Sequence, residues 1–414
     1  MGVTVSERFN KARYEEQMNI LYVVDADIRN PSFGNAQRTR LVYDALCKMG
    51  NVYVLDVREL RLLPQSGVKK LVNATWQRLV INTCGKCLIP VYPFPLRWSI
   101  ETLFPGIRFD VVVARYLYHV GILSLWSISS RLYVDVDDHP RQVFETIYNV
   151  KYNLIRRIWS RFINGLFCKF VLRKLTGSWI SNPNQVEMVR PYCPCRALEN
   201  VPFTLSDKKN TKSILKAMTV EHSLNEEFVF TVGAMGYPPN YLGVDSFLKN
   251  IWPVVRSKYP NLKYKIVGKG IPPQFLETWG EIPNVEALGY VEDISELYRD
   301  CMASVVPVQS GGGTCIKTLE SMSRSKICLS TPFGARGLPE GILKDGCAGV
   351  VVYNSAEEFI SALDRIRTDK CWRKKSEIAA ANYIEKNFSR GKFEKTVMEL
   401  ITRSQRQDGV MELA

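Results

Sequence analysis

The chain has 414 residues, of which 46% are hydrophobic and 23% are charged, and its formal net charge is +14. This composition is that of a globular protein, and it excludes a disordered, collagen-like or coiled-coil chain as the main state. The length favours two domains, and no apolar stretch approaches the roughly 18 residues of a membrane-spanning helix.

The first half alternates apolar strands with helices. A helix is predicted at Ala36–Met49, after a loop that contains Pro31 and Gly34, whereas the Pro-rich segment Leu60–Pro105 shows no pattern that we can assign. This order is typical of a doubly wound parallel sheet. Strands are predicted at Asn19–Asp25, Val52–Val57, Phe109–Ala114, Leu132–Val136, Gly177–Ser181 and Arg196–Glu199.

A basic segment, Thr146–Val186, contains seven Lys and Arg residues and no acid, and its apolar residues recur at helical spacing. Three interpretations remain open: a helix with its apolar face in the core, a helix on an anionic membrane, and a nucleic-acid-binding helix. No known nucleic-acid-binding motif supports the third, so we expect no nucleic-acid partner. The apolar positions expected on one face are Leu154, Ile155, Ile158, Trp159, Phe162, Ile163, Leu166, Phe167, Phe170 and Val171.

A polar linker, 206–226, separates an N-terminal Rossmann-like domain, 1–205, from a second one, 227–388. We expect a C-terminal helix and tail, 389–414, which crosses back to the first domain, and a break in the preceding helical stretch near Asp369. Strands of the second domain are predicted at Phe228–Val232, Lys263–Val267, Val285–Leu288, Ala303–Val306, Ile327–Ser330 and Gly349–Val352.

The segment PVQSGGGTCIKTLESM, Pro307–Met322, carries the sharpest chemical signal. Three glycines follow a predicted strand and precede a helix expected to begin near Thr314. Such a turn aims free N–H groups at an anion. Lys317 adds a positive charge, and Glu320 on the same side can accept two ribose hydroxyls. The set predicts a nucleoside diphosphate site, although it is neither a Walker loop nor a dinucleotide fingerprint.

Four motifs in order resemble the family-4, group 1, retaining glycosyltransferases of the GT-B fold, in their Gly-Gly-Gly-Thr subgroup. They are TVGAMGYPPNYLGVDSFLKNIWPVV, YKIVGKG, NVEALGYVEDISELY and PVQSGGGTCIKTLESMSRSKICLSTPFGARGL, between Phe228 and about Ile366. The resemblance implies an α/β protein of two Rossmann-like parallel-sheet domains that face a central cleft. It also implies a nucleotide sugar donor and neither a metal nor another cofactor.

The resemblance assigns donor-binding positions in both halves. Glu320 holds the ribose, the turn with Lys317 holds the diphosphate, and the loop Gly289–Asp293, with Val291, borders the nucleobase. The turn Gly233–Gly236 faces the phosphates, and the loop Ser32–Arg38 approaches the donor from the first domain. The expected donor-binding residues are Gly34, Gly233, Met235, Gly268, Val291, Gly311, Gly312, Gly313, Thr314, Lys317 and Glu320.

The chain departs from the family pattern at the cleft. The first of two glutamates that many members carry would fall at Gly312, and Cys315 stands where the subgroup usually has Arg. Met235–Asn240 provides neither the Arg nor the Lys of many relatives, so Arg336 is a candidate second cation for the diphosphate.

Polar residues at expected strand ends of the first half are further candidates. Asp135, Asp137, Asp138 and His139, in YVDVDDHP, could bind a metal, contact the acceptor or, for Asp138, cap a helix; the resemblance argues against the metal. His119 lies either in the cleft or in the core. The expected catalytic residues are Lys317, Glu320, Asp138 and His119.

The predicted protein is a cytoplasmic enzyme, peripheral on the inner face of a membrane. The N-terminus carries no secretory signal, and the eleven cysteines are interpreted as reduced thiols. Two cysteine pairs have side chains suited to zinc, Cys84 with Cys87 and Cys193 with Cys195. The one-residue spacing of the second pair argues against a zinc site.

We expect transfer of a hexose-type sugar, with retention, to a lipid-linked or surface-polysaccharide acceptor, and an anionic membrane surface as a further partner. The alternatives are a nucleotide-sugar epimerase of the same fold and an inactive nucleotide-sugar-binding or membrane-associated protein. Neither the sugar, the nucleobase nor the oligomeric state follows from the sequence.

Overall fold

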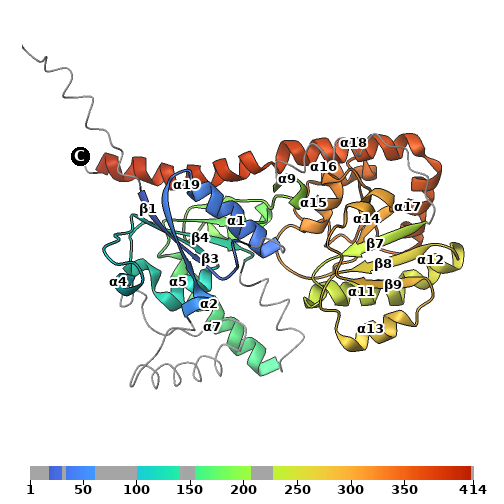
Figure 1. Ribbon diagram of the computed structural model, residues 1–414, viewed down its shortest axis with the longest axis horizontal. Coiled ribbons are helices and arrows are strands. Elements are labelled where there is room, and N and C mark those ends of the chain that lie inside the picture. The colour runs from blue at the N-terminus through green and yellow to red at the C-terminus, as the bar shows by residue number, and fades with distance from the viewer. Residues whose placement is uncertain are drawn as a thin grey trace, which may run out of the picture.

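A computed structural model describes residues 18–29, 34–60, 100–139, 141, 154–206 and 227–411. It contains two α/β domains side by side, each built on a six-stranded parallel sheet between helices (Figure 1). The predicted fold class of two Rossmann-like domains is therefore confirmed. Most of the linker and the Pro-rich segment Leu60–Pro105, with Cys84 and Cys87, lie outside the described residues.

The N-terminal sheet has the order β2-β1-β3-β4-β5-β6, and every neighbouring pair is parallel. Its strands coincide with the apolar runs of the sequence because a strand covered on both faces must be apolar throughout. The strands are β1 Met18–Val24, β2 Gly50–Asp56, β3 Val111–Arg115, β4 Leu132–Asp137, β5 Gly177–Ile180 and β6 Cys195–Ala197.

Helices and short 3-10 turns join these strands. Helix α1 begins at Gly34, two residues before its predicted start, and ends at Leu46. The others are α2 Val57–Leu60, α4 Ile100–Leu103, α5 Leu117–Leu123, α7 Leu154–Leu172, α8 Val186–Val189 and α9 Phe203–Ser206, with 3-10 turns at Leu125–Ser127 and Pro183–Gln185.

The C-terminal sheet has the order β12-β11-β10-β7-β8-β9, so the chain reverses its direction of travel across the sheet between β7 and β10. Its strands are β7 Phe228–Val232, β8 Lys263–Val267, β9 Val285–Gly289, β10 Ala303–Val306, β11 Cys328–Ser330 and β12 Val350–Val352. Its helices are α11 Pro238–Asn250, α12 Trp252–Lys258, α13 Pro273–Gly280, α14 Ser295–Asp300, α15 Ile316–Ser323, α16 Glu340–Leu343, α17 Ala356–Thr368 and α18 Lys370–Asn387, with a 3-10 turn at Lys344–Gly346.

The final helix, α19 Arg390–Met411, lies on the N-terminal domain, whereas α18 lies on the C-terminal one (Figure 1). Asp369 separates α17 from α18 and caps α18 through a 2.8 Å bond from the Trp372 N–H. Ion pairs join Arg390 of α19 to Asp44 of α1 at 2.9 Å and Glu394 of α19 to Lys48, two residues after α1. The chain thus crosses the domain junction a second time.

The apolar residues of the basic helix α7, predicted to share one face, divide between the core and the surface. Phe167, Val171 and Leu172 face the core, where a Cβ atom on Gly121 of α5 would collide with the Phe167 ring. The apolar positions span too wide an arc for one contact surface, so a second row points outward. Its four members are each more than half exposed: Ile158, Phe162, Leu166 and Phe170.

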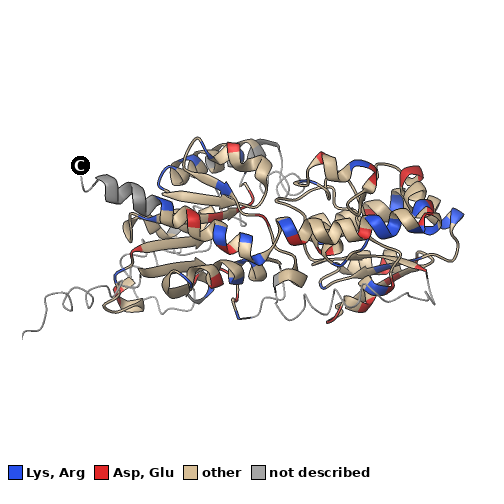
Figure 2. Cartoon of the chain, turned by 90° about the horizontal axis from the view of Figure 1, so that it is seen from above, with Lys and Arg blue, Asp and Glu red and all other residues tan. Residues whose placement is uncertain are grey.

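Charged residues lie mainly on the helices that flank the sheets, and the strands are largely free of them (Figure 2). In the part of the chain that the structure describes, no helix is both long and apolar enough to cross a bilayer.

Candidate active site

The loops after β7 and β10 meet at the point where the C-terminal sheet reverses, which is where parallel α/β sheets bind ligands. Gly233 and Gly268 pack backbone against backbone here, since Gly268 has a φ of +145° and any side chain on it would collide with the Gly233 carbonyl. Met235 is fully buried and donates its N–H to the Lys269 carbonyl at 2.8 Å. These predicted donor-binding residues therefore fix the loops after β7 and β8 against each other.

The glycine-rich turn follows β10 and faces the N-terminal domain. Gly311 and Gly313 have φ angles of +132° and +57°, which favour glycine. Helix α15 begins at Ile316, two residues later than predicted, because Gly313 is left-handed and Cys315 is extended. The Thr314 hydroxyl donates to the Ser181 carbonyl at 3.3 Å, so the turn is anchored to the residue that directly follows β5 of the other domain.

Two cations flank this turn. The Lys317 ammonium donates to Asn240 Oδ1 at 2.8 Å, and its Cε lies 2.6 Å from where a Cβ on Gly233 would be. The Arg336 guanidinium stacks on the Phe333 ring at 3.9 Å and donates to the Gly312 carbonyl. Among the described residues, neither cation has a carboxylate within ion-pair distance.

The local field is accordingly positive. Burial, together with the Arg336 charge, lowers the pKa of Lys317 below its ordinary value, and burial also lowers the pKa of Arg336. Burial alone would raise the pKa of Cys315, but the neighbouring Lys317 and Arg336 charges bring it below the ordinary value. Two partly buried cations that form no ion pair with the described residues lie beside a glycine-rich turn, and this arrangement is suited to a diphosphate.

The Glu320 carboxylate, predicted to hold the ribose, is hydrogen-bonded to the protein itself. Its carboxylate accepts 2.8 Å bonds from the Phe203 N–H of α9 and from Arg324 Nε, and its side chain is buried. Lys317 and Glu320 therefore contact different partners, and Glu320 connects α15 to the last described segment of the N-terminal domain. The ribose contact stays a prediction. Val291, expected near the nucleobase, packs on a small core cluster with Phe230 and Val267.

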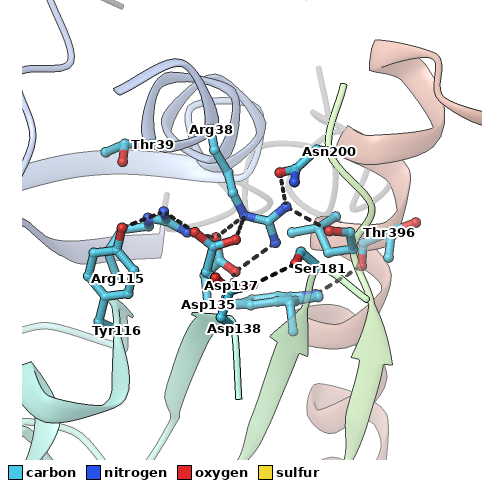
Figure 3. Close-up of polar contacts among 12 residues, drawn as sticks. Arg38, Thr39, Arg115, Tyr116, Asp135, Asp137, Asp138, Ser181, Asn200 and Thr396 are labelled. Carbon is cyan, nitrogen blue, oxygen red and sulfur yellow. Dashed lines mark hydrogen bonds and ion pairs between the residues drawn. The ribbon is translucent and has the colours of Figure 1, made fainter. Parts of the chain in front are cut away.

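The N-terminal side of the cleft is organised by a buried ion network at the ends of β3 and β4 (Figure 3). Arg38 binds both oxygens of Asp135 at 2.8 Å, and Arg115 binds Asp135 as well. Arg115 also contacts Asp137 and Asn35 Oδ1, each at 3.0 Å. Because both Asp135 oxygens accept from guanidinium groups, this aspartate acts as a structural anchor.

The network positions Gly34 against the second domain, since a Cβ on Gly34 would lie 3.9 Å from Ile316 Cδ1. Arg38 also donates to the Leu198 carbonyl at 2.7 Å and to Asn200 Oδ1 at 2.9 Å, while Asn200 reaches the Thr314 carbonyl at 3.4 Å. Gly34, in the segment predicted to approach the donor, thus lies beside the start of α15.

Asp138 extends from the end of β4 to the glycine-rich turn. It accepts a 3.4 Å bond from the Ser181 hydroxyl and lies directly against Gly312 and Gly313. Its enclosure between the domains, together with the Asp137 charge, raises the pKa of Asp138 to about 7, although Arg336 opposes this shift. Of the aspartates in YVDVDDHP, this one alone is recorded against the glycine-rich turn among the described residues.

His119 lies on α5, fully buried against Tyr118, with its Nδ1 bonded to the Arg115 carbonyl. Burial lowers the pKa of His119. No contact with the glycine-rich turn is recorded, so the structure places it in the N-terminal domain, away from the cations. His139 donates its N–H to Gln185 Oε1 at 3.1 Å. Cys193 and Cys195 are buried, and Cys193 contacts the Ser178 hydroxyl.

Several residues of the site were absent from the sequence prediction. Arg115 ends the apolar run VVVAR, and a lone charge at the carboxyl end of a buried strand is a usable signal. Ser181 and Asn200 carry no such signal, because their roles depend on contact with the other domain.

Comparison with known proteins agrees with this geometry. Residues 226–369 match the family model described as group 1 glycosyl transferases. The C-terminal domain is a group 1 glycosyltransferase domain. The fold of the whole chain is GT-B, as its structural neighbours show. A search of curated proteins found no match to the sequence.

Three solved structures illustrate the likeness. Sucrose-phosphate synthase from Thermosynechococcus elongatus is similar over 94% of this chain and 100% of its own, with 12% identity and a TM-score of 0.62. HepE of Anabaena, solved with UDP-glucose, covers 93% of this chain and 100% of its own, with 12% identity and a TM-score of 0.57. WaaG, a glycosyltransferase involved in lipopolysaccharide biosynthesis, covers 92% and 99%, with 14% identity and a TM-score of 0.56.

Proposed function

We propose that this protein transfers a sugar from a nucleoside diphosphate sugar to a glycan or glycolipid acceptor, with retention of configuration. The observation that carries the proposal is the pair of partly buried cations, Lys317 and Arg336, beside the glycine-rich turn. As the bond between the anomeric carbon and the diphosphate breaks, negative charge develops on the departing oxygen. Preorganised cations and backbone N–H groups stabilise this charge without a metal ion.

Two further observations support a nucleotide sugar as the donor. The crevice lies at the reversal point of the C-terminal sheet, which is the usual place for a nucleotide. HepE, which shares the fold, has been solved with UDP-glucose and with UDP. The Arg38–Asp135–Arg115 network brings the N-terminal domain to the cleft, where the acceptor would enter.

The activity is tested with a panel of UDP-, GDP- and ADP-sugars, by following donor hydrolysis or transfer in the presence and absence of EDTA. We expect at least one donor to be consumed, with the same rate after chelation, because protein cations supply the positive charge. Interconversion of the sugar without release of the nucleotide would instead indicate an epimerase. Binding of donors without turnover would identify a binding protein, and full dependence on Mg²⁺ or Mn²⁺ would overturn the metal-free mechanism.

We also propose that α7 attaches the enzyme to an anionic membrane, where a lipid-linked acceptor would be available. The outward row of Ile158, Phe162, Leu166 and Phe170 forms an exposed apolar stripe. Lys169, Arg173 and Lys174 are exposed near its C-terminal end. Each cation near an anionic surface contributes roughly 1 kcal/mol, and the apolar side chains add to this as they enter the interface.

Liposome flotation tests this attachment. The wild-type protein should float with phosphatidylglycerol-rich vesicles at low salt and much less with pure phosphatidylcholine. The triple variant Phe162→Ser, Leu166→Ser, Phe170→Ser should remain unbound, because it removes three exposed apolar side chains and no charge. A matched control with equally superficial residues of the C-terminal domain, Val254→Ser, Leu276→Ser, Ile378→Ser, should float like the wild type. Equal flotation of all three proteins would exclude α7 as the attachment site.

A further inference from the structure

Asp138 and the glycine-rich turn are far apart in the sequence and belong to different domains, but they are in contact in the structure. Gly312 belongs to the glycine-rich turn of the C-terminal domain, whereas Asp138 directly follows β4 of the N-terminal domain. A Cβ atom on Gly312 would overlap the carboxyl group of Asp138, with Oδ2 as its nearest atom. The glycine therefore cannot be replaced while Asp138 keeps its position.

The surroundings of Asp138 determine how this carboxylate is presented. The hydroxyl of Ser181, directly after β5, donates to Oδ1, whereas Oδ2 receives no hydrogen bond from the described residues. The charged and titratable groups that face it are Asp137 from its own loop, Arg38 from α1, Arg336 from the loop after β11 and Tyr237 before α11. Both carboxylate oxygens thus lie against the turn, Oδ1 beside Gly313 and Oδ2 beside Gly312, and only Oδ1 is held by Ser181.

We infer that Asp138 supplies, from the N-terminal domain, the carboxylate that the C-terminal domain lacks at position 312, and that it acts on the donor sugar. This inference deepens the proposed function and rests on it. A sugar joined to a diphosphate on the turn Gly311–Thr314 extends toward the N-terminal domain, because Thr314 is itself anchored to Ser181. Asp138 lies at that boundary, with its carboxyl group against Gly312 and Gly313.

Oδ2 accepts a hydrogen bond from a hydroxyl of the donor sugar. Its negative charge also stabilises the positive charge that develops at the anomeric carbon as the bond to the diphosphate lengthens. Asp138 forms no covalent bond, and the donor pair Lys317 and Arg336 keeps its role at the leaving group. Gly312 is required because any side chain there would displace the carboxylate.

Variants that move the carboxylate from position 138 to position 312 test the inference. Donor turnover and the binding of UDP or GDP are measured for each variant. Asp138→Asn, which keeps the shape, should retain nucleotide binding and lose roughly 100-fold in turnover, as is typical when one electrostatic group is removed. Gly312→Glu alone should also be impaired, since its side chain meets Asp138. The double variant Asp138→Ala, Gly312→Glu restores a carboxylate from the C-terminal domain. Its donor turnover should exceed that of either single variant at least about tenfold.

The outcomes separate this inference from the proposed function. A wild-type protein that consumes no donor overturns both. An active wild type whose double variant is no better than the weaker single variant overturns the inference alone. If Asp138 merely blocks the turn, Asp138→Asn and Asp138→Ala would bind nucleotide more tightly and turn over faster, which also contradicts it. Thermal unfolding confirms that each variant is folded.

The pH profile provides an independent readout. Because the pKa of Asp138 is about 7, the carboxylate form becomes populated as the pH rises through that value. The wild-type kcat/KM should therefore increase through about pH 7, and this limb should be absent in Asp138→Asn. An unchanged limb in the variant would show that another group causes it.

Discussion

Replacement of Lys317 by methionine should weaken the binding of UDP or GDP by about ten- to hundredfold without loss of fold stability. A charge-assisted hydrogen bond to a phosphate contributes roughly 1.5–3 kcal/mol, which corresponds to this range of affinity. Methionine retains most of the length of the lysine side chain, so the packing of Cε near Gly233 is kept. Isothermal calorimetry measures the affinity, and thermal unfolding measures the stability.

The direction of the stability change follows from the pKa. The pKa of Lys317 in the folded protein lies below its ordinary value, so at pH 7 the protonated side chain is more stable in the unfolded chain. Removal of the charge therefore raises the free energy of unfolding, while the lost hydrogen bond to Asn240 lowers it by about 1 kcal/mol. We expect a net change on the order of 1 kcal/mol in favour of the variant.

Lys249 provides the matched control for this experiment. It lies on α11 in the same domain, mostly exposed, and pairs with Asp245 one helical turn away at 2.7 Å. Lys249→Met should change neither nucleotide affinity nor stability beyond about 0.5 kcal/mol. If Lys317→Met binds nucleotide like the wild type, the diphosphate does not lie at this turn. If its affinity and stability fall together, the lysine is a structural residue.

Replacement of Asp135 by asparagine should destabilise the N-terminal domain by about 3–5 kcal/mol, because it leaves two buried guanidinium groups without their shared counter-charge. Arg38, Arg115 and Asp135 are all buried, and both oxygens of Asp135 are engaged. Urea unfolding followed by tryptophan fluorescence measures the loss, with Trp179 of β5 as a reporter in this domain.

Asp137→Asn is the matched control, since Asp137 contacts the same arginines but its side chain is 20% exposed. Its cost should be smaller than that of Asp135→Asn, because Asp137 keeps contact with solvent and Asp135 still neutralises both arginines. Equal effects of the two variants would contradict the view that Asp135 is the centre of the network.

The pH dependence of stability offers a second check on Asp135. Burial alone would raise the pKa of Asp135, but Arg115 and Arg38 hold it below the ordinary value. The ion network therefore stabilises the fold fully above about pH 4 and loses this contribution as the pH falls through the lowered pKa. The acid limb of the stability curve should be shallower in Asp135→Asn than in the wild type.

The sequence by itself determined the elements and the glycine-rich turn. Apolar runs such as VVVAR and FVFTV predict strands, because a parallel strand that is covered on both faces is apolar along its whole length. Gly311–Gly313 with Lys317 was recognisable because the residue types needed to approach an anion are neighbours in the chain.

The tertiary structure alone decided which residues complete the site. Glu320 was expected to be open to a ribose, but docking of α9 places the Phe203 N–H on its carboxylate. The apolar residues of α7 recur at helical spacing, but some lie in the core and others at the surface. Gly121 has no side chain, so the Phe167 ring packs against it, whereas Phe162 stays exposed. Asp138 meets Gly312 only because the two domains face each other. The local sequence pattern indicates whether a side chain is buried. Which residue it contacts depends on how distant segments of the chain pack together.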